Sequence, residues 1–228
     1  AWIFINDLSL WYLRRSRNRV GPTAESLKDK NNFYNTLNFV LVECCKVLAP
    51  LIPFTTEEIY KNLTGKESVH LSDFPVANMK LHDDKLEGEM EFARKIVEMA
   101  HSKRKEFQIK VRQPLAHLTV YNSQLTINDE IIELIKDELN VKKISFEKGK
   151  GEVFVSLDTN LTKELKEEGE ARDIVRMIQQ ERKRLGTTLD EKVNVVLEDW
   201  PKAFEDYIKR KASVGSITKG PKFLVARK

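Results

Sequence analysis

The stretch DLSLWYLRRSRNRV near the start of the chain combines aromatic rings with a dense group of arginines. On a helix, Trp11 and Arg15 lie four residues apart, as do Arg15 and Arg19, while Arg14 and Arg17 lie three apart on the neighbouring strip. A ring beside a row of guanidinium groups can stack an unpaired base and hold its phosphates. The alternative is that the ring belongs to a core and the arginines extend from its edge into solvent. We expect both in part, with the ring mainly buried and the arginines exposed.

Basic residues gather at three places, although the net charge is only +4. Residues 14 to 19 contain four arginines and no acid, and residues 103 to 112 contain five Lys or Arg and one Glu. Residues 207 to 228 contain seven Lys or Arg and no acid. Such local clusters on a nearly balanced chain indicate contact with a polyanion. On charge alone, however, a solvated charged face is the favoured explanation.

No pattern in the sequence predicts a catalytic residue, a metal site or a bound cofactor. The chain has no G-x-x-x-x-G-K-[ST] loop, no G-x-G-x-x-G loop and no nucleophile elbow. Acidic residues alternate with lysines, as in KELKEEGEARD, which is typical of a helix surface with ion pairs. The histidines lack the i, i+4 spacing of a helical metal pair. Cys44 and Cys45 are adjacent, so we expect free thiols in a reducing compartment, one of them facing a core.

Residues 1 to 107 are predicted to form an α-helical bundle. Apolar residues recur at three- and four-residue steps and predict helices over residues 2–19, 31–48 and 84–107. None of the apolar runs reaches the roughly 18 residues that a membrane span requires, and we predict no membrane partner.

A further helix is expected to begin at FTTEEIY and to end at Gly65. Thr55 and Glu58 have the spacing of a capping box, and Phe54 is placed to pack on Ile59 across the cap.

Residues 108 to 228 are predicted to form a small α+β domain with a mostly antiparallel sheet. Strands are expected at LAHLTVY, VKKISFE, EVFVSLD, KVNVVLE and KFLVAR. Helices are expected at NDEIIELIKDELN, over residues 161–185 and at PKAFEDYIKRKA, with Asn140 and Gly186 ending the first two. The strands VKKISFE and EVFVSLD should pair as a hairpin around KGKG. The sequence shows no internal repeat.

Several of these segments, taken in order, resemble one family. INDLSLWYLRRSRNR, then VLAPLIPFTTEEIYKNL and SVHLSDFP, resembles the anticodon-binding domain of class I aminoacyl-tRNA synthetases that charge branched aliphatic amino acids. KVRQPL, DELNVKKISF and LTKELKEEGEARDIVRMIQQERKRLG are similar to the C-terminal part of isoleucyl-tRNA synthetases. The resemblance runs from residue 2 to about residue 190 and is looser over the last forty residues.

The chain also departs from that family. The catalytic domain with its HIGH-type and KMSKS-type motifs, the editing domain and the cysteine-rich zinc segment of some bacterial members have no counterpart in this sequence. The stretch between ELNVKKISF and LDTNLTKEL is short for the family. The sequence also lacks an initiator Met, and we expect it to be a C-terminal fragment without catalytic activity of its own.

The resemblance implies that the parent enzyme joins isoleucine to its tRNA through an aminoacyl-adenylate, using ATP and Mg²⁺ in the cytoplasm. This part would bind the anticodon stem-loop, and its partners would be that tRNA and the catalytic and editing domains of the same chain. Base contacts in the unpaired loop would specify the tRNA, and phosphate contacts would position it.

The resemblance and the local charge together suggest which side chains contact tRNA. They come from the first helix, from KVRQP and from the basic residues before it: Arg14, Arg15, Arg17, Arg19, Lys103, Arg104, Lys105, Lys110, Arg112 and Gln113. Gln113 is the candidate for a base contact, because its amide both donates and accepts. The alternative is that Gln113 and Pro114 shape the entry into a strand. Arg172 and Arg176 are expected to form structural ion pairs.

Two alternatives stay open at this point. The chain would be a structural module that holds a synthetase together or joins it to other synthetases, with its basic surface facing protein or solvent. Alternatively, it would be the equivalent part of a valyl or leucyl enzyme, although KVRQPL and ELNVK favour isoleucine.

Overall fold

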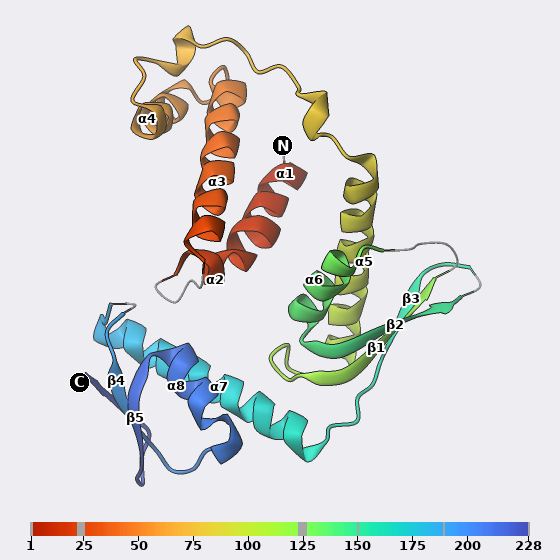
Figure 1. Cartoon of the computed structure of the whole chain (residues 1–228), viewed down its shortest axis with the longest axis vertical. Coiled ribbons are helices and arrows are strands. Elements are labelled where there is room, and N and C mark those ends of the chain that lie inside the picture. The colour runs from red at the N-terminus through yellow and green to blue at the C-terminus, as the bar shows by residue number, and fades with distance from the viewer. Residues whose placement is uncertain (1, 22–25, 123–126, 150, 189, 228) are drawn as a thin grey trace. The chain divides into compact units, whose positions relative to one another are not determined.

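The computed structural model of the chain describes residues 2–21, 26–122, 127–149, 151–188 and 190–227. It divides into two compact units, Ala1–His82 and Asp83–Lys228. The described part of the first unit is helical, whereas the second contains helices and strands (Figure 1). The prediction of a helical part followed by an α+β part is therefore confirmed.

The long helix α5 (Asp84–Glu106) belongs to the second unit by its packing. It contacts α6 (Asp129–Leu139) and β3 (Phe154–Leu157), both of which follow it in the chain. The boundary that the sequence predicts at residue 107 follows the change from helices to strands and not the packing of α5. As a boundary between domains it stays a prediction.

The first unit contains five helical segments and two short 3₁₀ turns among its described residues. They are α1 (Trp2–Asn6), the π-helix η1 (Asp7–Leu13), α2 (Arg17–Val20), α3 (Leu27–Leu48), α4 (Pro53–Thr64), η2 (Val69–Leu71) and η3 (Met79–Leu81), α1 running directly into η1. Tyr60 of α4 packs with Cys45, Ala49 and Val69 in a small buried cluster. Cys45 is thus the cysteine that faces a core.

The helix predicted over residues 2–19 is not one regular α-helix. In the π-helical stretch each N–H reaches one residue further back, and Arg14 N still donates to Ser9 O. A turn at Ser16 then separates η1 from α2. Spacing rules for a regular α-helix therefore do not hold for the arginines of this region. Tyr12 is nevertheless packed, because its ring stacks on Phe33 with the centroids 5.5 Å apart.

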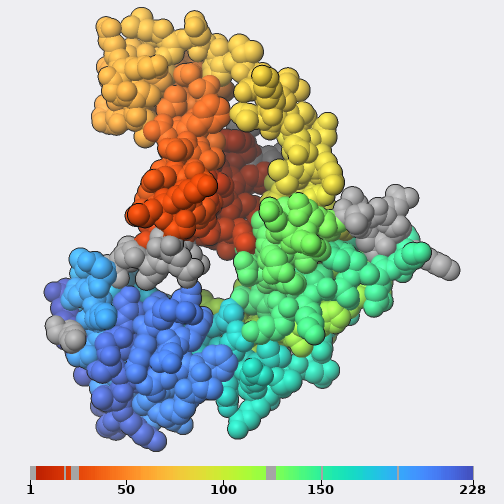
Figure 2. All heavy atoms as spheres, in the orientation of Figure 1, coloured from red at the N-terminus to blue at the C-terminus, as the bar shows by residue number. Residues whose placement is uncertain are grey.

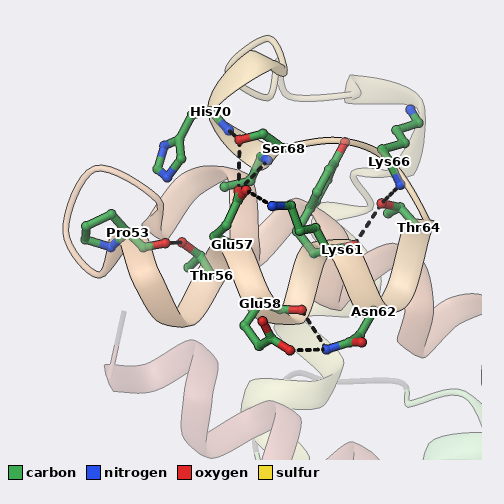
Figure 3. Close-up of polar contacts among 12 residues, drawn as sticks. Pro53, Thr56, Glu57, Glu58, Lys61, Asn62, Thr64, Lys66, Ser68 and His70 are labelled. Carbon is green, nitrogen blue, oxygen red and sulfur yellow. Dashed lines mark hydrogen bonds and ion pairs between the residues drawn. The ribbon is translucent and has the colours of Figure 1, made fainter.

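Helix α4 begins with a proline and not with the predicted capping box. Pro53 occupies the first turn, where its missing N–H leaves no hydrogen bond unmade. Phe54 is 90% exposed, so its predicted contact with Ile59 is wrong. Glu58 accepts instead from the side-chain amide of Asn62 at 2.9 Å (Figure 3). Gly65 ends the helix at φ 67°, as predicted.

Glu57 fastens the loop that follows α4 back onto the helix. Its Oε2 accepts from Ser68 Oγ and from the backbone N–H of Val69, both at 2.9 Å, and its Oε1 pairs with Lys61 Nζ at 2.8 Å (Figure 3). The hydrogen bond from Lys61, followed by the one from Val69 N, lowers the pKa of Glu57 to about 2. The loop is thus held by a carboxylate that stays ionised over most of the pH range.

The second unit begins with α5, which is followed by a three-stranded sheet. The sheet consists of β1 (Leu115–Asn122), β2 (Val141–Lys148) and β3. The strand order is β2-β1-β3, with β1 parallel to β2 and antiparallel to β3. Because β1 lies between β2 and β3, the hairpin predicted around KGKG is wrong. Asn140 ends α6 in the left-handed conformation, as predicted.

A second three-stranded sheet follows α7 (Lys163–Leu185), which Gly186 ends as predicted. Its strands are β4 (Val193–Leu197), β5 (Val214–Lys219) and β6 (Leu224–Arg227), in the order β5-β4-β6, with η4 (Lys202–Phe204) and α8 (Glu205–Ala212) between β4 and β5. In Figure 2 this blue segment forms one continuous block of atoms, in keeping with its buried core of α7, α8 and strand residues.

The sheets differ from the one, mostly antiparallel sheet that we predict from the sequence. The described residues form two sheets, and each has one parallel and one antiparallel pairing. Strand β5 has no counterpart among the predicted strands, because Gly215 and Ser216 are weak strand formers.

Candidate nucleic-acid interface

The arginines of the first unit differ in how far they are committed to contacts within the protein. Arg14 and Arg17 are exposed, and Arg15 and Trp11 are partly buried. Arg14 Nε donates to the carbonyl oxygen of Leu10 at 2.9 Å. These arginines keep the exposure that contact with a polyanion requires.

Arg19 joins α2 to α3 inside the first unit. It makes two hydrogen bonds to Asp29, from Nε to Oδ2 at 2.8 Å and from Nη2 to Oδ1 at 2.7 Å. Its guanidinium also lies over the ring of Phe33, 5.9 Å from the centroid. The hydrogen bonds that Arg19 donates to Asp29 lower the pKa of Asp29 and raise the pKa of Arg19. Arg19 therefore has a structural role, and a contact with RNA would have to use the same guanidinium group.

The three basic residues at the end of α5 are placed very differently. Lys105 is exposed, and Lys103 pairs with Glu106 at 2.8 Å while its side chain stays 45% exposed. Arg104 is only 1% exposed. Burial, followed by the charge of Arg172, lowers the pKa of Arg104 to about 10. Arg104 cannot reach an RNA molecule, and its inclusion among the predicted contacts is wrong.

The segment from residue 107 to residue 114 joins α5 to β1, and we call it the α5–β1 connection. Arg104 holds it in place from within. Its guanidinium donates to the carbonyl oxygens of Lys110 at 3.0 Å, Gln113 at 2.9 Å and Leu139 at 2.5 Å. A planar guanidinium suits this task, because its five donors point in fixed directions. The sequence marks Arg104 as basic but gives no sign that it is buried.

Lys110 and Arg112 project from the α5–β1 connection and share one acidic neighbour on α7. Lys110 Nζ lies 2.7 Å from Asp173 Oδ2, and Arg112 Nη1 lies 3.7 Å from Asp173 Oδ1. The two basic side chains are 71% and 42% exposed. Ion pairs this exposed contribute little stability, so a phosphate can compete with Asp173 for either basic side chain.

Gln113 is used inside the protein. Its Nε2 donates to the carbonyl oxygens of Leu165 at 2.6 Å and Pro114 at 3.1 Å, so both donors of its amide are occupied. This arrangement supports the alternative in which Gln113 shapes the entry into β1. The side chain lies against Gly169 of α7, where a Cβ would stand 2.4 Å from Gln113 Oε1.

Gly169 is thus a positioning residue that we do not predict from the sequence. A signal exists, because a glycine stands inside a helix built otherwise of strong helix formers. Between α7 and the α5–β1 connection lies an open groove of about 560 Å³, lined by basic and acidic side chains that include Lys110, Lys166, Glu170 and Asp173. Its mixed charge does not select a polyanion by itself.

The beginning of α7 is also fixed to β2 and to the end of α6. Glu168 pairs with Lys142 at 2.6 Å and with Arg172 at 2.8 Å, and Arg172 also bonds to the side chain of Asn140. Burial alone would raise the pKa of Glu168, but the hydrogen bonds from Lys142 and Arg172 together lower it. The prediction that Arg172 forms a structural ion pair is confirmed.

The predicted contact residues fall into two separate groups. Arg14, Arg15, Arg17 and Arg19 belong to the first unit and the other six to the second. Within the described ranges, no three His, Cys, Asp or Glu residues come together as a metal site would require. Among the helices that the structure describes, none is long and apolar enough to cross a membrane.

Comparison with known proteins adds what the geometry leaves open. Residues 2–121 match the family model described as the anticodon-binding domain of tRNA ligase. The isoleucine–tRNA ligase of Dehalococcoides mccartyi is 34% identical over 245 residues, covering 95% of this chain and 24% of the relative. That of Protochlamydia amoebophila is 42% identical over 160 residues, covering 68% of this chain and 15% of the relative. That of Chlamydia trachomatis is 44% identical over 148 residues, covering 63% of this chain and 14% of the relative.

The chain thus spans about a quarter, or less, of the length of these relatives. The matched region contains the first-unit arginines, α5, the α5–β1 connection and nearly all of β1. It makes up more than half of the 228 residues. The chain therefore belongs to the family of anticodon-binding domains of tRNA ligases.

Proposed function

We propose that this chain binds the anticodon stem-loop of isoleucine tRNA as the C-terminal part of a longer isoleucine–tRNA ligase. The observation that carries the proposal is the match to the anticodon-binding family over residues 2–121, together with isoleucine–tRNA ligases as relatives along 95% of the chain. Its contribution to the reaction is binding energy and register, which bring the acceptor end of the tRNA to a distant active site.

Two groups of basic residues, exposed or partly exposed, support the proposal. Phosphate contacts come from Arg14, Arg15 and Arg17 in the first unit and from Lys105, Lys110 and Arg112 in the second. Arg19 is a weaker candidate because its two hydrogen bonds to Asp29 join α2 to α3. Lys103, which is paired with Glu106 and 45% exposed, is a further candidate. Gln113 acts by shaping the connection.

The chemistry of the reaction belongs to the remainder of the longer enzyme. ATP and Mg²⁺ are the cofactors of that enzyme, which acts in the cytoplasm with its catalytic and editing domains in the same chain. This chain alone is expected to form no aminoacyl-tRNA.

A salt titration tests the proposal directly. Binding of isoleucine tRNA to this chain is measured by filter retention between low and physiological salt. The log–log slope should reflect about 0.7 to 0.9 for each phosphate contact. The triple variant R14Q/R15Q/R17Q and the double variant K110Q/R112Q should each lower both affinity and slope.

The matched control is K80Q/K95Q, which removes two exposed lysines outside both groups. It should bind as the original chain does. Retention no greater than background at low salt would refute the proposal for this chain.

The second candidate function is structural, and one observation favours it. The first unit exposes Phe54 at 90%, Leu71 at 73% and Val76 at 90%, which is more typical of a surface covered by protein than of one facing solvent. In that case the chain holds the longer enzyme together. The arginine and lysine variants, placed in the full-length ligase, would then leave kcat/KM for tRNA charging unchanged.

A further inference from the structure

The two sheets of the second unit have the same construction. In each, a helix of 23 residues leads into the central strand, a shorter helix leads into a parallel neighbour, and a last strand returns antiparallel on the other side. The strand orders β2-β1-β3 and β5-β4-β6 correspond position by position. Figure 1 shows the first series from yellow to green and the second in cyan and blue.

The connections between the long helices and the central strands match residue by residue. Gln108 and Gly186, 78 positions apart, both follow their helices in the left-handed conformation, at φ 55° and φ 66°. The next backbone N–H returns in each case to the helix, from Ile109 to Arg104 O at 2.8 Å and from Thr187 to Arg182 O at 3.1 Å.

A buried arginine closes each connection in the same way. Arg104 and Arg182, also 78 positions apart, are 1% and 4% exposed. Each donates to the carbonyl oxygens of the residues six and nine positions after it, at 3.0 and 2.9 Å for Arg104 and at 2.7 and 2.7 Å for Arg182. Each also approaches a carbonyl oxygen at the end of the shorter helix. Arg104 Nη2 lies 2.5 Å from the oxygen of Leu139, the last residue of α6, and Arg182 Nη1 lies 3.5 Å from that of Ser213, the residue after α8.

The buried residues follow the same numbering. Along the long helices, Ala93, Ile96 and Ala100 of α5 correspond to Ala171, Ile174 and Ile178 of α7, each pair 78 apart and buried. Along the shorter helices the spacing is 73, and it relates Ile135 to Ile208, Leu139 to Ala212 and the left-handed Asn140 to the left-handed Ser213. Two spacings maintained through the helices and the turns that end them are more than shared topology alone would produce.

We infer that the second unit consists of two copies of one α–β–α–β–β module, residues 84–157 and 163–227, each closed by an equivalent buried arginine. This inference departs from the sequence prediction, which finds no internal repeat. The copies agree mainly in buried positions and in bonds to backbone carbonyls, which leave little trace in side-chain identity. Their exposed residues differ freely, and these dominate a comparison of the two sequences.

The repeat assigns a role to Arg104. In the first copy, the connection that this arginine closes carries Lys110 and Arg112, so Arg104 is a positioning residue for two side chains proposed to meet phosphate. This step rests on the proposed function. The second copy supplies an internal control, because Arg182 closes a connection that carries Thr188 and Asp190 at the positions equivalent to Lys110 and Arg112.

Hydrogen exchange on the whole chain tests the repeat without RNA. Lysine at position 104 or 182 keeps the charge but loses the fork of donors. R104K should speed exchange of the Ile109 and Leu115 amides about tenfold or more, and R182K should do the same at Thr187 and Val193. Each variant should leave the amides of the other copy within about twofold. Equal effects of either variant on both copies, or none on either, would refute the inference.

Binding of tRNA tests the positioning role. R104K should weaken binding and lower the salt slope as K110Q/R112Q does, about 0.7 to 0.9 for each lost contact. Added to K110Q/R112Q, it should have no further effect. R182K should leave affinity within about twofold of the original. If R104K loosens the connection while affinity stays unchanged, the positioning role is wrong and the repeat stands; if the unaltered chain binds no tRNA, the proposed function fails instead.

If R104K or R182K prevents folding, hydrogen exchange in the unaltered chain still tests the inference. In the unaltered chain, the Ile109 and Leu115 amides should exchange together with the strands of the first copy, and the Thr187 and Val193 amides with those of the second. Exchange of either pair as fast as in an exposed loop would show that the arginines do not close the connections.

Discussion

The contact between Gly169 and Gln113 allows the α5–β1 connection to pack against α7. In a helix interior, alanine is about 1 kcal/mol more favourable than glycine. At this position, however, a Cβ would stand 2.4 Å from Gln113 Oε1 and 2.9 Å from its Cδ. The amide would have to leave its hydrogen bond to Leu165 O, and loss of a buried hydrogen bond costs about 1 to 3 kcal/mol.

The prediction is that G169A stabilises the chain only when Gln113 is absent. G169A in a Q113A background should raise the free energy of unfolding by up to about 1 kcal/mol, whereas G169A alone should leave it unchanged or lower it. Urea denaturation of the four proteins measures the coupling. Equal effects of G169A in both backgrounds would show that the two residues act independently.

At the residue scale, the sequence predicts where basic residues cluster better than it predicts which of them are exposed. The basic character of residues 103 to 112 is plain, but Arg104 is buried among carbonyl oxygens while Lys105 beside it is exposed. Which of them faces the interior depends on Leu139, 35 positions away in the chain. No local pattern contains that information.

Among the elements, the loop after α4 is expected to be sensitive to acid. The pKa of Glu57 is about 2 in the folded chain, compared with an ordinary value of 4.5. Because the folded pKa is the lower one, the stabilisation is complete above about pH 4.5 and is lost as the pH falls towards 2.

We therefore expect E57Q to lower the melting temperature of the first unit at pH 7 and to have little effect near pH 2. Circular dichroism melts at intervals between these values measure the difference. E58Q is the control, since Glu58 is exposed and its side chain accepts only from Asn62 of its own helix. A difference between E57Q and the original chain that persists unchanged to pH 2 would contradict the role of the carboxylate.

Elements with a strong period and a distinct ending are predictable from the sequence. Gly65, Asn140 and Gly186 end their helices in the left-handed conformation, as their residue types indicate. The pairing of strands is less predictable. The segments of β2 and β3 are adjacent in the chain, yet β1 lies between them, because β2 pairs in parallel with β1 after the crossover helix α6.

Across the whole second unit, the repeat predicts which surface charges the fold does not require. Asp137 and Glu138 near the end of α6 correspond, at the spacing of 73, to Arg210 and Lys211 near the end of α8. The same module therefore exists with acidic and with basic residues at this place.

We predict that R210D/K211E folds with its core intact. It should lose no more than about 2 kcal/mol of stability, the cost of replacing two favourable cations at a helix C-terminus. Thermal and urea unfolding measure the change. The buried variant I208A is the contrast and should cost about 2 to 5 kcal/mol. A larger loss for the charge exchange than for I208A would contradict the equivalence of α6 and α8.

Helix α7 takes part in both copies. Its first half carries Leu165, Glu168 and Asp173, which hold the first copy, and its second half carries Arg182, which closes the second. A continuous α-helix fixes distance and rotation at about 1.5 Å and 100° per residue. Adding one residue at its middle would rotate one copy against the other by more than a quarter turn, whereas adding seven would nearly restore their phase and separate them by about 10 Å. The length of this helix therefore sets the distance that a ligand must span in order to contact both copies.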